Sequence, residues 1–393
     1  MNKVILKAGK EKIVNRHHPW IFSGAIDSVI GDPENGSQVH IIGSNGNFFG
    51  IGAFSPYSQI RVRMWTFENE KIDQEFFDKR IDRSIKRRSY LMDKYHDSAW
   101  RLIHAESDQI PGLIVDQYSD VLVVQILSSG SEFYRPLLMD SLRKVTGINN
   151  IYERSDLDVR KLEGLKERTG TVSGNIPQEI LINEGGYQFI VDLQSSQKTG
   201  FYLDQRINRR IIAEYCNNKD ILDVFSFTGG FSIYAAGNNA KKIVSLDSSA
   251  EALALAKRNQ ALNGFSNNEH EWIEGDAFQG LRKMRDQNRK FDLVILDPPK
   301  FAPTAAHVDR AARAYKDINL LGFKLLNPGG ILVTFSCSGG IHESLFQKIV
   351  SDAALDAGAY ATILERLFQG PDHPVSLTFP EGGYLKGLIC LKN

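Results

Sequence analysis

Cysteine is scarce in this chain of 393 residues, and long apolar runs are absent. The three cysteines, Cys216, Cys337 and Cys390, are too few and too widely spaced for a disulfide framework or a zinc site. No uninterrupted apolar stretch reaches the length of a membrane span, and residues 1–12 lack the apolar run of a signal peptide. We therefore expect a cytoplasmic protein that binds no metal and enters no membrane.

An excess of charge is also absent, because 47 basic residues balance 47 acidic ones. A protein that coats nucleic acid non-specifically needs many cations on phosphates, so this balance disfavours that class. A local basic face remains compatible with it. One candidate face comprises Lys7, Lys10, Lys12, Arg16, His17 and His18, and the other Lys79, Arg80, Arg83, Lys86, Arg87 and Arg88. We interpret the second as the solvated face of a helix at about residues 73–95.

The chain is long enough for two or three domains, and its pattern changes twice. Short strand candidates at 4–6, 37–42, 48–54 and 60–65, separated by turn signals, predict a small β-barrel. A long helix, strands at 113–116 and 121–126, a helix at 132–146 and a strand at 150–154 predict a small α+β domain. We divide the chain into residues 1–72, 73–180 and 181–393.

The third part contains a strand at 221–225, a glycine pair, a helix at 231–236 and a strand at 242–246 that ends in Asp247. This order is typical of the first half of a Rossmann-type nucleotide site, in which the acid accepts hydrogen bonds from a ribose. The turn itself comprises Phe225, Ser226, Phe227, Thr228, Gly229 and Gly230. It lacks the G-x-G-x-x-G spacing that holds a diphosphate, which disfavours an NAD-type oxidoreductase. The turn suits S-adenosylmethionine (SAM), which has no phosphate, although glycines also serve purely structural turns.

Three further strands of this part end in polar or reactive residues. Asp276 ends a short strand at 272–277, Asp297 follows an apolar strand at 291–296, and Cys337 ends a strand at 329–338. In a doubly wound sheet, ligands bind outside the carboxyl ends of the parallel strands. We therefore expect these side chains to share one edge of the sheet with the glycine turn.

These motifs resemble class I SAM-dependent methyltransferases and, more narrowly, the bacterial 23S rRNA cytosine-C5 methyltransferases of the RlmI type. The resemblance is carried by residues 198–206, 223–230, 297–301, 315–319, 334–338 and 380–387. Residues 18–24 resemble the opening of a PUA RNA-binding domain. The implied fold is α/β: a Rossmann-like class I methyltransferase domain preceded by a PUA-like β-barrel and a small α+β domain. The implied partner is 23S rRNA, bound as a single strand or with a flipped-out base, and a homodimer is possible.

The resemblance also implies which residues bind SAM. Residues 225–230 lie at the methionine moiety, Asp247 and Ser248 at the ribose, and Asp276 and Ala277 near the adenine. The remaining implied cofactor contacts are Asp297, Phe201, Asp204 and Arg206, the last three in a segment that folds over the cofactor. For Arg206, Arg209 and Arg210 an exposed helix face is the alternative interpretation.

Carbon 5 of a pyrimidine is a poor nucleophile, and a thiolate that adds to carbon 6 activates it. Cys337 is the candidate nucleophile, with a lowered pKa, whereas Cys216 and Cys390 are interpreted as small buried apolar residues. A buried structural role is the alternative for Cys337. Asp297 or the Pro298 carbonyl would read the amine edge of a flipped cytosine. Lys300 and Lys316 are further candidates for substrate binding.

The motif at residues 297–300 is similar to the Asp/Asn-Pro-Pro-aromatic tetrad of amine methyltransferases, but its fourth residue is Lys300. A second, release-assisting cysteine is missing here, so the base that removes the carbon-5 proton is open among Asp297, Lys300 and Glu381. Two alternatives remain: methylation of a base nitrogen or exocyclic amine, and a non-catalytic PUA-containing RNA-binding protein. His17, His18 and Trp20 are candidates for stacking on RNA, although we interpret Trp20 as barrel core.

Overall fold

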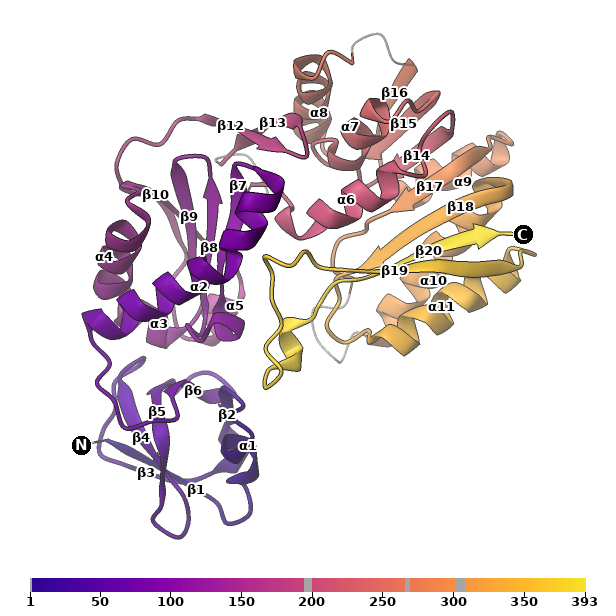
Figure 1. The fold of residues 1–393 in the computed structure, drawn as a ribbon. Coiled ribbons are helices and arrows are strands. Elements are labelled where there is room, and N and C mark those ends of the chain that lie inside the picture. Colours follow the sequence, from indigo (N-terminus) through magenta and orange to yellow (C-terminus); the bar gives the residue numbers. More distant parts are fainter. Residues whose placement is uncertain (1, 194–199, 266–268, 302–307) are drawn as a thin grey trace. The chain divides into compact units, whose positions relative to one another are not determined.

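The computed structural model describes residues 2–193, 200–265, 269–301 and 308–393 (Figure 1). The chain forms two compact units. The first comprises Met1–Ile182, Val191–Phe201 and Pro371–Gly382, and the second comprises Asn183–Ile190, Tyr202–Gly370 and Gly383–Asn393. Within the described ranges, every helix is too short or too polar to span a bilayer.

The N-terminal part of the first unit is a six-stranded sheet in the order β2-β6-β5-β4-β1-β3. Its strands are β1 (Lys3–Leu6), β2 (Trp20–Phe22), β3 (Ile26–Ile30), β4 (Gln38–Ile42), β5 (Phe48–Phe54) and β6 (Ile60–Thr66), and α1 (Lys12–Asn15) lies between β1 and β2. Along β1 and β4, buried residues alternate with half-buried ones, and Val4, Ile21 and Val62 are fully buried in the core of this sheet. The predicted strand-rich part is confirmed, and β2 and β3 are additions to it.

The rest of the first unit is a five-stranded sheet in the order β11-β10-β9-β8-β7 with helices packed on it. Its strands are β7 (Ala99–His104), β8 (Leu113–Tyr118), β9 (Val121–Ile126), β10 (Asn150–Ser155) and β11 (Arg168–Ser173). The helices are α2 (Gln74–Tyr95), α3 (Ser129–Phe133), α4 (Arg135–Thr146) and α5 (Val159–Leu162). Helix α2 begins where the Asp73 side chain accepts a hydrogen bond from the Phe76 amide, a standard N-cap.

The second unit is built on a seven-stranded sheet in the order β16-β15-β14-β17-β18-β20-β19. The parallel strands are β14 (Asp220–Val224), β15 (Lys242–Asp247), β16 (Glu269–Glu274), β17 (Phe291–Leu296) and β18 (Leu326–Ser336). The strands β19 (Ala361–Phe368) and β20 (Lys386–Lys392) add an antiparallel edge. The predicted Rossmann-like order is confirmed, with one change: the third strand ends at Glu274, because Asp276 caps the next helix.

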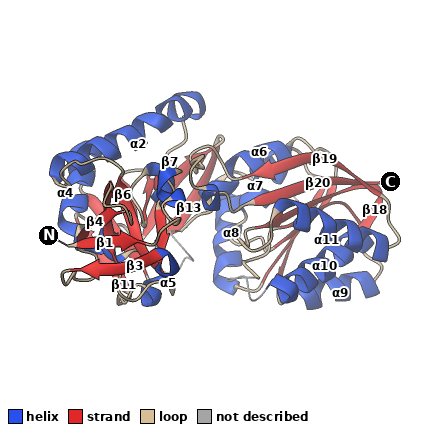
Figure 2. Cartoon of the chain, turned by 90° about the horizontal axis from the view of Figure 1, so that it is seen from below, coloured by secondary structure: helices blue, strands red, loops and turns tan. Residues whose placement is uncertain are grey.

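Helices cover both faces of this sheet (Figure 2). On one face α9 (Ala277–Asp286), α10 (Val308–Leu325) and α11 (Glu343–Asp356) share a core with the strands, and on the other face α6 (Arg206–Ala213) and α7 (Gly230–Gly237) do so. The helix α8 (Ala250–Leu262) joins β15 to β16. The strand order reverses between β14 and β17, which places a ligand crevice outside the carboxyl ends of these strands. The hairpin of β12 (Glu179–Glu184) and β13 (Tyr187–Asp192) carries the chain between the units.

Candidate functional site

The turn between β14 and α7 has an unusual backbone. Phe225, Phe227 and Gly229 all have positive φ angles, of 64°, 47° and 84°. Such angles strain residues other than glycine and cluster at functional sites. The Phe225 amide donates to the Leu246 carbonyl at 2.8 Å, and the Phe227 amide donates to Asp247 Oδ2 at 2.8 Å. The end of β15 therefore fixes the conformation of the turn.

The acids predicted for the cofactor lie at the ends of the neighbouring strands. Half-buried Asp247 ends β15 and accepts a second hydrogen bond, at Oδ1, from the Ser249 amide at 2.9 Å. Ser248 is exposed beside it. Asp276 is exposed, and its Oδ1 accepts from the Gln279 amide at the start of α9, next to buried Ala277. The parallel pairing of β14, β15 and β16 brings these residues to the edge that carries the turn.

The turn contains polar atoms that suit a bound ligand. The hydroxyls of Ser226 and Thr228 are buried, and neither has a hydrogen-bond partner among the described residues. Buried hydroxyls in native proteins normally have hydrogen-bond partners, and the amino-acid end of SAM would supply partners for these two. At Gly230, a Cβ atom would lie 3.3 Å from the Arg209 side chain, so the chain leaves little room for a larger residue. These residues fit SAM, which supplies an electrophilic methyl group when bound.

In and after the predicted covering segment, Asp204, Arg206 and Arg209 are buried and have partners. Arg206 is 1% exposed and donates from Nε to Glu184 Oε2 at 3.3 Å. Arg209 is 2% exposed and donates to both Glu184 oxygens, at 2.7 and 2.8 Å. The exposed-face interpretation is therefore wrong for Arg206 and Arg209, because a buried carboxylate compensates their charges. Asp204 Oδ2 accepts from the Tyr384 hydroxyl at 2.6 Å.

Phe201 belongs to the first unit, where its backbone amide donates to the Tyr118 hydroxyl at 3.2 Å. The neighbouring Lys198 and Thr199 of the predicted motif lie outside the described residues.

Asp297 and Cys337 follow β17 and β18, which are hydrogen-bonded parallel neighbours with Leu296 opposite Thr334. Asp297 Oδ2 accepts from Gln205 Nε2 at 3.0 Å, and Gln205 Oε1 in turn accepts from Asn208 Nδ2 at 2.6 Å. This relay orients the carboxylate. Sequence reasoning missed it because Gln205 and Asn208 come from a helical segment about 90 residues away. Pro298 is buried after Asp297, whereas Lys300 is exposed.

Cys337 is half-buried, in contrast to the other two cysteines. Cys216 and Cys390 are buried in apolar cores, which confirms their interpretation as small apolar residues, and burial raises the pKa of each to about 12. The loop of Cys337 is held through Ser338. The Ser338 carbonyl accepts from Lys386 Nζ at 2.7 Å, and the Ser338 hydroxyl lies 3.0 Å from the Tyr315 hydroxyl.

Tyr202 is a further member of the site that the predictions did not include. Its ring meets Phe227 edge-on, with centroids 5.2 Å apart. Burial raises the pKa of its hydroxyl, and negative charge on Asp297, Asp204, Cys337 and Asp247 raises it further. The pKa of Tyr202 is therefore affected by acidic groups at the ends of three strands and by Asp204 of the covering segment. The position of Tyr202 in the motif at residues 198–206, two residues before Asp204, is the sequence signal that could have indicated it.

Lys316, predicted to bind substrate, lies on α10. Its ammonium forms an ion pair with Asp356, the last residue of α11, at 2.7 Å. This pair raises the pKa of Lys316.

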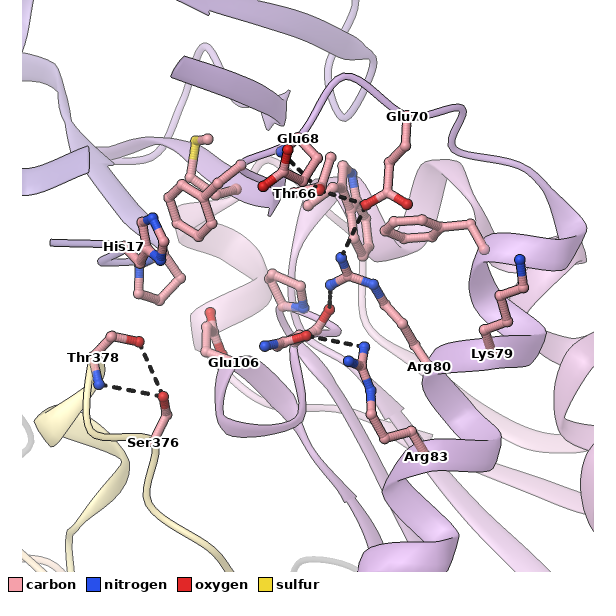
Figure 3. A pocket seen from close by; sticks show the side chains of 17 residues that line it. His17, Thr66, Glu68, Glu70, Lys79, Arg80, Arg83, Glu106, Ser376 and Thr378 are labelled. Carbon is pink, nitrogen blue, oxygen red and sulfur yellow. Dashed lines mark hydrogen bonds and ion pairs between the residues drawn. The ribbon is translucent and has the colours of Figure 1, made fainter. Parts of the chain in front are cut away.

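The first unit contains a cavity of about 690 Å³ (Figure 3). Its lining includes His17, Thr66, Arg80, Arg83 and Ser376. Arg80 is 8% exposed, lies 4.0 Å from the centre of the Phe76 ring and donates to the Gln109 carbonyl. Arg80 therefore lines this cavity instead of facing solvent.

Arg88, on the same helix, is buried and pairs with Asp108 at 2.7 Å. The solvated-face interpretation of α2 is thus wrong for Arg80 and Arg88. It holds for Lys79 and Lys86, which are exposed and pair with acids one turn away.

The aromatic residues near the N-terminus also lie in the first unit. Trp20 is half-buried and donates from Nε1 to Glu106 Oε1 at 2.8 Å, so its interpretation as barrel core is wrong. The alternation along β2 places Ile21 in the core instead. His17 stacks on Phe67, and His18 lies 3.2 Å from Glu381, which was one of the candidate bases.

Comparison with known proteins adds independent evidence. A model of the S-adenosylmethionine-dependent methyltransferase family matches residues 167–386, and a PUA-like domain model matches residues 4–67. Relatives from Tolumonas auensis and Aeromonas salmonicida, both named ribosomal RNA large subunit methyltransferase I, are 50% and 49% identical, with 98% of each chain covered. The domain boundaries at residues 72 and 180 stay a prediction.

Solved structures share the fold over the whole chain. A putative SAM-dependent methyltransferase from Streptococcus mutans has a TM-score of 0.86 at 21% identity and covers all of both chains. A putative methyltransferase solved in complex with SAH gives a TM-score of 0.87 at the same identity. The chain therefore belongs to the SAM-dependent methyltransferases, in the family whose curated members are named ribosomal RNA large subunit methyltransferase I.

Proposed function

We propose that the protein transfers a methyl group from SAM to carbon 5 of a cytidine in 23S rRNA, through a covalent adduct between Cys337 and carbon 6. The name of the relatives specifies large-subunit ribosomal RNA, and the base and its carbon atom are our inference. The observation that carries the proposal is the position of Cys337. It follows β18 directly beside the end of β17, where Asp297 lies, at the edge that holds the glycine turn.

In this proposal, the side chains at this edge have separate roles in the reaction. The Cys337 thiolate adds to carbon 6 of the ring, which makes carbon 5 nucleophilic toward the methyl group. After transfer, a base removes the carbon-5 proton and the cysteine leaves, which restores the double bond. Asp297 is our candidate to contact the amine edge of the base, with its carboxylate oriented by Gln205. Of the three candidate bases, Asp297 lies at this edge, whereas Glu381 lies beside His18 in the first unit.

RNA contacts are proposed for the first unit as well. A flipped base needs its flanking strand held in place, and aromatic and cationic side chains do this in single-stranded RNA complexes. The cavity of Figure 3 offers His17, Phe67 and Arg83 together, which makes it our candidate for holding part of the rRNA.

Replacing Cys337 by alanine tests the covalent route. We expect the rate of 5-methylcytidine formation on 23S rRNA, measured by mass spectrometry of digested nucleosides, to fall by about three orders of magnitude or more, since the nucleophile is lost. The matched variant Cys390→Ala removes a buried thiol from the same sheet and should keep its activity. Full activity of Cys337→Ala, or a methyl group on a nitrogen, would support the amine-transfer alternative instead.

Calorimetry with SAM tests the non-catalytic alternative. The wild-type protein and Cys337→Ala should both bind SAM, because the glycine turn is held by hydrogen bonds to Leu246 and Asp247 at the end of β15. A wild-type protein that releases no binding heat and forms no methylated nucleoside would indicate an RNA-binding protein without catalysis.

A further inference from the structure

Lys386 is a buried lysine at the catalytic edge of the sheet. It is the first residue of β20 and pairs with Ser336, the last residue of β18. The residue is 8% exposed, and its Nζ donates to the Ser338 carbonyl at 2.7 Å. The ammonium therefore lies against the short loop that carries Cys337.

This ammonium is poorly compensated by the rest of the chain. Among the described residues, no carboxylate lies within ion-pair distance of Lys386, and its Nζ donates to a neutral carbonyl instead. Burial lowers the pKa of Lys386 to about 8, and the nearby charge of Lys300 lowers it as well. Negative charge on Cys337 and then on Glu343 acts in the opposite direction. A thiolate at Cys337 is thus the strongest stabilising charge for this buried cation.

Lys300 is a second cation near this loop, but it is exposed to solvent. The other titratable groups that act on this region are acids or phenols. Negative charge on Cys337 raises the pKa values of Tyr315, on α10, and of Tyr202, before α6. Asp297, after β17, and Glu343, at the start of α11, bring negative charge to the same region. A cysteine surrounded in this way needs a nearby cation before its thiolate is stable.

We propose that Lys386 is a positioning residue for Cys337: its ammonium fixes the loop through the Ser338 carbonyl and stabilises the thiolate of Cys337. This inference rests on the proposed function, in which Cys337 is the nucleophile. No bond to Lys386 forms or breaks. The thiol proton leaves to solvent, and the ammonium keeps its three protons while the sulfur carries the negative charge.

The pH dependence of Cys337 alkylation by iodoacetamide tests this proposal without RNA or SAM. Peptide mass spectrometry separates Cys337 from Cys216 and Cys390, whose alkylation should be slow throughout. For Lys386→Gln we expect the midpoint of the Cys337 profile to rise by about one to three pH units, since an opposite charge at close range shifts a pKa by this amount. Alkylation at pH 7 should slow about tenfold or more. An unchanged midpoint would overturn the proposal.

Two variants control for structure and charge. Lys386→Arg keeps the positive charge and should restore most of the low midpoint. Lys392→Gln, at the far end of β20, removes a lysine that is bonded to the Phe323 and Leu326 carbonyls and should leave the midpoint unchanged. If Lys386→Gln fails to bind SAM or to melt cooperatively, Lys386→Met replaces the charge with an apolar chain of similar length. A normal Cys337 midpoint in that variant equally contradicts the proposal.

The outcome is separable from that of the proposed function. A raised Cys337 midpoint in Lys386→Gln would support the interaction between the Lys386 ammonium and the Cys337 thiolate. If Cys337→Ala nevertheless methylated fully, the covalent mechanism would be rejected while that interaction stood. Loss of methylation in Lys386→Gln with an unchanged midpoint would show that Lys386 acts in another way, and would reject the pair.

Discussion

Asp223 lies inside β14 with its carboxyl group fully buried. It accepts a hydrogen bond from the Ser232 hydroxyl at 2.6 Å, and that hydroxyl lies 2.7 Å from the Ser245 hydroxyl. Burial raises the pKa of Asp223 to about 7, although the Ser232 hydrogen bond opposes the rise. The native protein therefore holds this proton more tightly than the unfolded chain does, where the pKa is near 3.8.

This difference predicts a pH-dependent stability. The contribution of neutral Asp223 is fully present below about pH 4 and is lost as pH rises to about 7, at ~1.4 kcal/mol per unit. Replacement by asparagine should remove this component, so the stability of Asp223→Asn relative to wild type should improve from pH 4.5 to pH 7.5. Urea unfolding at both pH values measures it. The exposed Asp286→Asn serves as the control, and a constant difference between wild type and Asp223→Asn would contradict the assignment.

Residues differ in how far sequence could place them. Asp247, Asp297 and Cys337 could be predicted to share one edge, because apolar strands followed by polar residues are visible in sequence and parallel strands align their ends. Gln205 and Lys386 could not be predicted as their neighbours, because each comes from another segment and reaches this edge only through tertiary packing. The burial of Arg209 could not be predicted, because a charged residue on a helix is expected to be solvated until its buried partner, Glu184, is known.

At the scale of elements, one buried carboxylate joins α6 to the hairpin β12–β13. Glu184 is fully buried and receives two guanidinium groups as well as the Tyr234 hydroxyl. Burial alone would raise the pKa of Glu184, but Arg209 and Arg206 hold it below its ordinary value. Arg209 also donates to the Tyr202 carbonyl at 3.0 Å, and its side chain packs beside Gly230. The ion cluster therefore supports the cofactor turn from behind.

Removing this carboxylate leaves two buried cations unpaired. For Glu184→Ala we expect the free energy of unfolding at pH 7 to fall by about 3–5 kcal/mol, the usual cost of breaking a buried ion pair from one side. SAM affinity, measured by calorimetry, should fall with it because the turn loses its support. The exposed Glu214→Ala, at the end of α6, is the matched control. A loss below about 1 kcal/mol would mean that solvent reaches the two arginines.

Elements also show why sequence patterns predicted some strands and missed others. The strand β9 (Val121–Ile126) is fully buried and apolar except for Gln125, so its composition alone indicates it. In β7 (Ala99–His104), Arg101 interrupts the apolar pattern, because Asp116 on the neighbouring strand β8 pairs with it. A buried strand can therefore contain an arginine when an acid lies opposite it on the next strand. Sequence alone does not show that Asp116 lies opposite Arg101.

At the scale of the whole molecule, the chain passes between the two units several times. Residues 371–382 lie between β19 and β20 in sequence, yet they belong to the first unit. There, the Asp372 carbonyl accepts hydrogen bonds from buried Arg88 at 3.0 and 2.9 Å, and Asp372 Oδ2 accepts from the Arg101 amide. The first unit is therefore incomplete in any fragment that ends before residue 371.

A fragment of residues 2–182 tests this dependence. It keeps the Asp108 partner of Arg88 but lacks the Asp372 carbonyl, so we expect a broad, weakly cooperative thermal transition by circular dichroism. A synthetic peptide of residues 371–382 should raise the midpoint in a dose-dependent manner, because it restores the Asp372 contacts. A scrambled peptide is the control. A sharp thermal transition whose midpoint does not change with added peptide would show that these contacts are dispensable.

The interleaving of the two units limits how such a protein can be rebuilt. Neither half can be exchanged for a homologous module by a single splice. A crossover anywhere between β13 and residue 371 would combine Arg88 from one parent with residues 371–382 from the other. Substitutions in the loop after β19 and in α2 should therefore be inherited together. A chimaera that exchanges the catalytic half would need to carry residues 371–382 from the same parent as the N-terminal half.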